Sequence, residues 1–95
     1  MTSEETICFQ VLDKYARERH SCFVAEFFPD RNATEYIVCF RPAGGTKDSP
    51  HRYACRNITM RVADVVATAK NKILPDDVRT NIERELSALN IEISR

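Results

Sequence analysis

The sequence predicts an α+β fold, in which a three-stranded antiparallel sheet follows one helix and precedes two more. Two observations predict this fold. Aromatic and β-branched runs separated by turn residues lie in the middle of the chain, and amphipathic helical patterns flank them. In the resulting α-β-β-β-α-α order, the amphipathic helices can cover at least one face of the sheet. A chain of 95 residues has room for one core, so we expect one compact domain over residues 1–95.

The first helix is predicted over residues 4–19. Thr2 and Glu5 have the spacing of a capping box, in which each side chain accepts a hydrogen bond from the other residue's backbone N–H. Apolar residues recur at helical spacing and fill one arc of this helix, whereas polar residues fill the opposite arc. The apolar arc comprises Ile7, Cys8, Val11, Leu12, Tyr15 and Ala16.

Three strands are predicted in the middle of the chain. Residues 22–28 and 35–41 are rich in aromatic and β-branched residues, and the six residues 29–34 suit the loop of an antiparallel hairpin. The ten-residue segment 42–51 contains glycine and proline and predicts a loop longer than a tight hairpin needs. Residues 52–60 are then predicted to form the third strand.

Two helices are predicted after the sheet. The first covers residues 61–73 and ends before Pro75, because a residue that precedes proline avoids helical dihedrals. The second begins at Pro75, which suits a first helical turn, and ends near Asn90. Residues 91–93 alternate in polarity and predict a short edge strand. The apolar stripe that the first of these helices is expected to bury comprises Val62, Val65, Val66, Ala69 and Ile73.

The four cysteines, Cys8, Cys22, Cys39 and Cys55, show no Cys-x-x-Cys spacing, so no structural zinc site is expected. We interpret them as free thiols that behave as small apolar residues. His20 stands two residues before Cys22, but we expect a solvated turn histidine rather than a base for the thiol. The sequence shows no cofactor fingerprint, so no cofactor is expected and the domain is predicted to be non-catalytic. A thiol enzyme using Cys22 or Cys55 is the alternative.

Charge is balanced over the whole chain but is unevenly distributed along it. The 14 basic and 14 acidic residues give a net charge of zero, which excludes strong global attraction to polyanions. Residues 41–72, however, carry seven basic and two acidic groups, whereas the segments on either side of them are acidic. The middle of the chain is therefore where an anionic partner is expected to bind.

An anion-facing patch is predicted on the second and third strands and the loop between them. Alternation along the third strand predicts that Tyr53 and Cys55 point inward. Arg52 and Arg56 then point outward, and Arg41 at the end of the second strand can join them. The candidate binding residues are Arg41, Lys47, His51, Arg52 and Arg56.

The predicted function is that of a non-catalytic protein-protein interaction module, such as an adaptor, a small subunit or a homodimer. Both faces of the first two strands carry apolar side chains, so helices confined to one face would leave an apolar face for a protein partner or a second copy. An amphipathic helix is the other candidate surface. In the first strand, the apolar residues are Phe23, Ala25 and Phe27 on one face and Val24 and Phe28 on the other.

Binding of RNA through the basic segment 41–72 is the alternative function. Double-stranded-RNA-binding domains share the element order α-β-β-β-α, which is a likeness of order and not of residues. Their final helix opens with a lysine-rich run, whereas the predicted helix here opens with Arg61-Val62-Ala63-Asp64. RNA binding would therefore be weak and sensitive to salt.

No membrane partner is expected. No apolar run approaches the roughly 18 residues that a membrane-spanning helix needs. The N-terminal residues 1–5 are acidic, whereas a secretory signal begins with basic residues and continues with an apolar stretch. The sequence therefore predicts a cytoplasmic protein.

Overall fold

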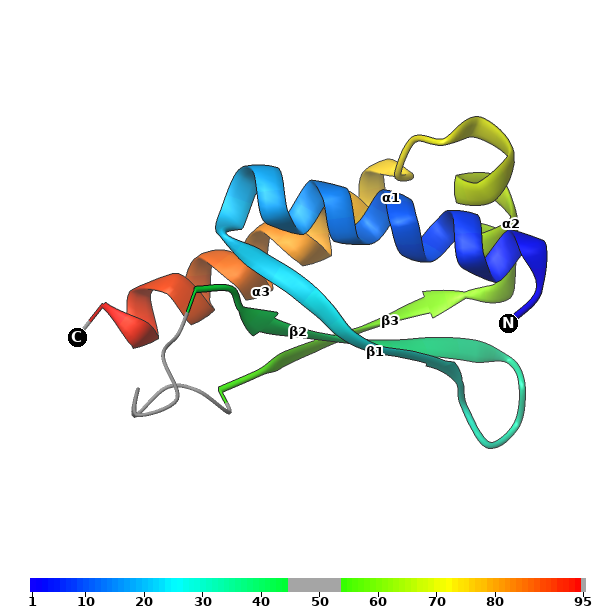
Figure 1. The fold of residues 1–95 in the computed structure, drawn as a ribbon. Helices are drawn as coiled ribbons and strands as arrows, with labels where there is room; N and C mark the ends of the chain where they lie inside the picture. Colours follow the sequence, from blue (N-terminus) through cyan, green and yellow to red (C-terminus); the bar gives the residue numbers. More distant parts are fainter. Residues whose placement is uncertain (45–53, 95) are drawn as a thin grey trace.

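The computed structural model of the chain describes residues 1–44 and 54–94. It shows three helices and three strands in the order α-β-β-β-α-α, so the predicted α+β fold class is confirmed (Figure 1). The elements are α1 (Ser3–His20), β1 (Cys22–Pro29), β2 (Glu35–Pro42), β3 (Arg56–Arg61), α2 (Val62–Asn71) and α3 (Asp76–Ile93).

The three strands form one antiparallel sheet in the order β1-β2-β3, with β2 in the centre. Val38 of β2 lies opposite Phe27 on one side and Ile58 on the other. A register shift between Val24 and Glu26 marks a β-bulge in β1. Because of the extra residue, Val24 and Phe27 both pack against the core, although simple alternation would place them on opposite faces.

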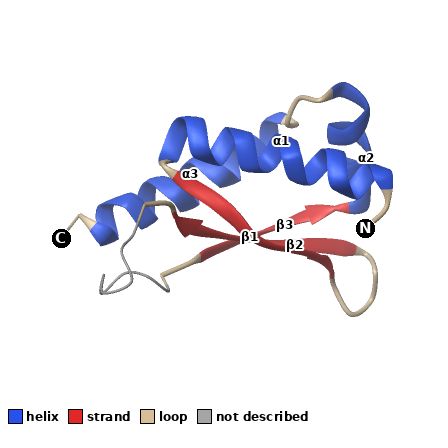
Figure 2. Ribbon diagram, viewed as in Figure 1, coloured by secondary structure: helices blue, strands red, loops and turns tan. Residues whose placement is uncertain are grey.

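All three helices lie on the same side of the sheet (Figures 1 and 2). α1 packs mainly against β1 and α2, and α3 packs mainly against β3. The core therefore lies between one face of the sheet and the helices, and no described element covers the other face. The largest fully buried side chains of this core include Leu12, Val38, Phe40, Met60, Ile82, Leu86 and Leu89.

α1 begins as the sequence predicts and is tied to the strand that follows it. The Thr2 hydroxyl accepts a hydrogen bond from the Glu5 N–H, and the Glu5 carboxylate accepts one from the Thr2 N–H, which completes the capping box. Ser21 ends the helix in the left-handed conformation, with φ 52°, and the chain turns directly into β1. Asp13 then accepts a hydrogen bond of 2.9 Å from the Val24 N–H, which links α1 to β1.

α2 buries only part of the stripe that its sequence predicts. Val65 and Ala69 are buried, but Val62 and Val66 remain 40% and 42% exposed. Ile73 lies beyond the end of α2, because Lys72 caps the helix in the left-handed conformation, with φ 58°. A helix of 10 residues that packs chiefly beside α1 buries one narrow line of side chains, so three of the five stripe residues are exposed.

α3 continues to Ile93, so the prediction of an edge strand over residues 91–93 is wrong. Two side-chain contacts hold the last turns against the rest of the fold. The Asn90 amide donates a hydrogen bond to the His20 carbonyl oxygen, and Glu92 forms an ion pair with Arg56 of β3. These contacts involve residues distant in the sequence, so local polarity did not indicate them.

β3 is shorter than predicted, since it begins at Arg56 rather than at residue 52. Residues 52 and 53 lie outside the described part of the chain. Ala54 and Cys55 precede the strand and are not part of it. The first paired residue, Arg56, lies opposite Phe40 of β2.

Candidate functional site

The uncovered face of the sheet carries two rows of side chains that cross all three strands. Ile37 of β2 lies opposite Phe28 of β1 and Thr59 of β3. Cys39 of β2 lies opposite Glu26 and Asn57 in the same way. We call the surface formed by the side chains of these two rows, together with Phe23 and Arg41, the open face. Its residues are Phe23, Glu26, Phe28, Ile37, Cys39, Arg41, Asn57 and Thr59.

The open face is apolar in part and is bordered by charges of both signs. Phe28 is 41% exposed, and Phe23 and Ile37 are half-buried. The Arg17 guanidinium of α1 lies over the Phe23 ring, 5.6 Å from its centre. Exposed aromatic and aliphatic side chains on adjacent strands form the type of patch that interaction surfaces use.

The Cys39 thiol of the open face lies beside the Cys55 thiol, which precedes β3, but only Cys39 is buried. Burial and the adjacent Cys55 thiol raise the pKa of Cys39, and Arg41 partly opposes that increase. Cys55 is exposed, so the prediction that it points inward is wrong. The reason lies in the register. Arg56 is opposite the fully buried Phe40, so Arg56 is the residue that takes the inner side.

The predicted basic patch is not assembled as expected. Arg41 belongs to the open face, whereas Arg56 lies on the helix-covered side and forms an ion pair with Glu92, with Nη2 2.5 Å from Oε2. The prediction that the two arginines share one face is therefore wrong. Three of the five candidate binding residues lie outside the described residues, namely Lys47, His51 and Arg52.

His20 is buried, so the prediction of a solvated turn histidine is wrong. Its Nε2 atom lies 2.9 Å from Oε2 of Glu83 in α3. The Cys22 thiol donates a 3.2 Å hydrogen bond to the His20 carbonyl oxygen and not to the imidazole. Burial raises the pKa of Cys22, which is opposite to the shift that activates a thiolate nucleophile.

Glu83 joins two side chains of α1 to α3. Its carboxylate accepts a hydrogen bond from the Tyr15 hydroxyl and lies beside His20. These two contacts, the Tyr15 hydrogen bond above all, hold the pKa of Glu83 below its usual value. Burial and the same carboxylate raise the pKa of Tyr15. The cluster therefore fixes Tyr15, His20 and Glu83 in a preformed arrangement between the helices.

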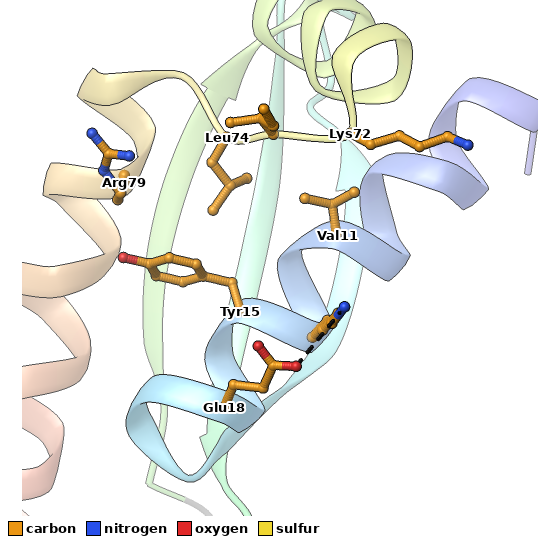
Figure 3. Close-up of a pocket in the computed structure, with 8 residues that line it drawn as sticks. Val11, Tyr15, Glu18, Lys72, Leu74 and Arg79 are labelled. Atoms are coloured by element: carbon orange, nitrogen blue, oxygen red, sulfur yellow. Dashed lines mark ion pairs between the residues drawn. The ribbon is translucent and has the colours of Figure 1, made fainter.

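A groove lies between α1, the connection from α2 to α3, and the first turn of α3 (Figure 3). It encloses about 240 Å³. Val11 of α1 points towards the segment that carries Leu74, and the Tyr15 ring extends towards α3 (Figure 3). The floor of the groove is therefore apolar. We call this feature the α1 groove. Its lining residues are Val11, Lys14, Tyr15, Glu18, Lys72, Ile73, Leu74 and Arg79.

The rim of the α1 groove is mostly cationic. Lys14 pairs with Glu18 at 3.9 Å across one turn of α1, and Arg79 pairs with Asp76. Lys72 has no ion-pair partner among the residues that the structure describes. Local sequence patterns do not predict this groove, because it forms only where α1 and residues 72–74 are adjacent in space. The Lys-Ile-Leu-Pro run at residues 72–75 was the available signal.

No protein-family model matches the chain, and no curated protein or solved structure shows significant similarity to it. Among the described residues, no helix is both long enough and apolar enough to cross a bilayer.

Proposed function

We propose that this domain is a non-catalytic protein-protein interaction module that binds a second copy of itself through the open face. The observation that supports this proposal most is the one-sided arrangement of the helices (Figure 2). Phe28 and Ile37 are left on the side of the sheet that no described element covers. Burial of such side chains against a partner is favourable by about 25 cal/mol per Å² of apolar surface.

The charges of the chain favour a second copy as that partner. Net charge is zero, so two copies do not repel each other at long range. On the open face, Glu26 of β1 lies opposite Cys39, while Arg41 lies opposite Phe23 and Arg17 lies over the Phe23 ring. In an isologous dimer, the twofold axis can place Glu26 of one copy against Arg17 or Arg41 of the other. An open face with a single sign of charge would not have this property.

Two matched substitutions test the proposal. Phe28→Glu introduces a carboxylate on the open face, and Val66→Glu introduces one at an equally exposed apolar position in the helical layer, since the two side chains are 41% and 42% exposed. Sedimentation equilibrium of the wild type over a wide concentration range should show a reversible dimer. The dimer should be lost in Phe28→Glu and retained in Val66→Glu. Circular dichroism would confirm that both variants are folded.

Two results would contradict self-association through the open face. The first is a wild-type protein that stays monomeric at near-millimolar concentration. The second is a dimer that Val66→Glu disrupts as strongly as Phe28→Glu, which would place the interface on the helices. If the protein is monomeric and the NMR signal of the Phe28 backbone amide shifts only when a different protein is added, the domain is an adaptor or a small subunit.

RNA binding through residues 41–72 has less support. Arg41 and Arg56 lie on opposite sides of the sheet, and Glu92 already neutralises Arg56. Titration of the protein with a short RNA duplex at low salt tests this alternative. Binding that is lost in an Arg52→Glu, Arg56→Glu double variant would favour RNA over a second copy of the chain.

A further inference from the structure

We propose that the α1 groove is a second binding site, which takes an acidic peptide segment with an aliphatic side chain from a partner protein. The groove lies in the helical layer, on the side of the molecule opposite to the open face (Figures 1 and 3). It therefore remains accessible when two copies associate through their sheets. The proposal goes beyond self-association and does not depend on it.

The floor of the groove accounts for the aliphatic side chain. Val11, Leu74 and the Tyr15 ring line it. Ile73 lies at its edge and is 65% exposed, although isoleucine is among the residues most often buried. An aliphatic side chain placed in the groove would cover Ile73 and would extend the apolar contact of Val11 and Leu74. A purely polar anion would leave this surface exposed to water.

The rim of the groove accounts for the acidic residues. Lys14, Lys72 and Arg79 surround the apolar floor, whereas Glu18 is the acidic lining residue. Lys14 lies on α1 and Lys72 lies at the end of α2, so carboxylates on both sides of an aliphatic residue would each approach an ammonium group. Lys14 pairs with Glu18 and Arg79 pairs with Asp76, so the excess positive charge at the rim is that of Lys72. An acidic and aliphatic segment matches both the sign of the rim and the character of the floor.

The groove is preformed and so does not require reorganisation on binding. The Lys72 N–H donates a 2.8 Å hydrogen bond to the Thr68 carbonyl, and the Arg79 N–H donates a 2.9 Å hydrogen bond to the Pro75 carbonyl. These bonds fix the two ends of the connection between α2 and α3. The hydrogen bond to Glu83 holds Tyr15 in place. A site fixed in this way loses little conformational entropy when a ligand binds.

Fluorescence anisotropy with three labelled peptides tests the chemistry of the ligand. The probe has the sequence Asp-Glu-Leu-Leu-Glu-Asp. In the second peptide serine replaces both leucines, and in the third Asn and Gln replace the acids. The full-length protein should bind the probe more tightly than either control peptide, and added salt should weaken binding. A serine peptide that binds as well as the probe would overturn the role of the apolar floor.

Substitutions in the protein test the location of the site. Lys72→Asn removes the charge and keeps a residue that tolerates the left-handed backbone of this position. Ile73→Ser removes the apolar edge. Lys70→Glu is the matched control, because Lys70 is exposed in α2 but does not line the groove. We expect Lys72→Asn to weaken probe binding by roughly fivefold, Ile73→Ser to weaken it by a similar factor, and Lys70→Glu to change it by less than about twofold.

Three outcomes would overturn the proposal. The first is that the probe does not bind at near-millimolar protein concentration. The second is that Lys70→Glu weakens probe binding as much as Lys72→Asn does, which would indicate diffuse attraction to lysines. The third is weakening by Phe28→Glu alone, which would place the peptide on the open face. Phe28→Glu tests self-association and Lys72→Asn tests the groove. Each proposal can therefore fail without the other.

Discussion

The Tyr15 hydroxyl donates a hydrogen bond to the Glu83 carboxylate, which connects the middle of α1 to the middle of α3. His20 approaches the other oxygen of the same carboxylate. The partly exposed Glu83 side chain thus contacts two residues of α1. In addition, Asn90, near the end of α3, donates a hydrogen bond to the His20 carbonyl oxygen. The two longest helices of the chain are joined by polar contacts as well as by the core.

The stability of the protein should depend on the ionisation of Glu83. Its pKa in the folded state lies below the ordinary value of 4.5, because Tyr15, His20 and Arg19 stabilise the carboxylate. This contribution to the free energy of unfolding is therefore present above pH 4.5 and is lost as the pH falls through the lower, folded-state pKa. Glu83→Gln should destabilise the protein near neutral pH by about 1 kcal/mol, since the side chain is partly exposed.

Urea unfolding of the wild type and Glu83→Gln across the acid range checks this prediction. The difference in the free energy of unfolding should shrink as the pH falls. Glu5 and Asp30 also have lowered pKa values, from their hydrogen bonds at a helix start and in a turn, but both proteins share these groups. A difference that stays constant with pH would show that Glu83 acts through its shape and not through its charge.

The two faces of the sheet should respond differently to the same substitution. Phe40 is fully buried on the covered face, and Phe28 is 41% exposed on the open face. Phe40→Ala should lower the free energy of unfolding by about 3–5 kcal/mol, a large part of the stability of a small domain. Phe28→Ala in the monomer should cost less than about 1 kcal/mol. Equal losses, measured by urea unfolding at low protein concentration, would contradict an open face.

The elements that sequence predicted well are those whose signals are local. The capping box of Thr2 and Glu5 and the apolar arc of α1 lie within one segment, so the sequence alone locates the helix. The predicted faces of Cys55 and Arg56 are wrong, because the orientation of these side chains depends on the pairing of β3 with β2. Cys55 is exposed and Arg56 turns towards α3, and no feature of residues 52–60 by itself distinguishes that arrangement from its opposite.

The candidate surfaces were predictable to different degrees. An apolar face left free by the helices was expected from the composition of the first two strands, although the bulge in β1 determines which phenylalanine lies there. The α1 groove was not expected, because Val11 and Leu74 are distant in the sequence. The contact between His20 and Glu83 was also not predicted, because these two residues are distant in the sequence. The groove and the His20 contact both depend on residues that are far apart in the sequence, and local patterns in a single sequence do not indicate such contacts.

The four cysteines should react with thiol reagents in an order set by their burial. Cys55 is exposed and should be alkylated first by iodoacetamide. Cys8 is fully buried, and burial raises its pKa to about 12, so it should react only after unfolding. Mass spectrometry of timed digests gives the order directly. Early modification of Cys8 in the folded protein would contradict the packing of α1 against the sheet.

The ion pair between Arg56 and Glu92 should account for the helical conformation of the last turn of α3. Both side chains are partly exposed, at 38% and 51%, so the coupling energy between them is expected to be no more than about 1 kcal/mol. A double-mutant cycle with Arg56→Ala and Glu92→Ala, read by urea unfolding, measures it. Glu92→Ala should also speed amide exchange at Ile93, because the turn then loses its attachment to β3. Glu85→Ala removes the carboxylate of a longer ion pair with Arg84, at 3.8 Å, and should leave that exchange unchanged. Zero coupling together with unchanged exchange at Ile93 would show that the turn is held by the partial burial of Ile93 alone.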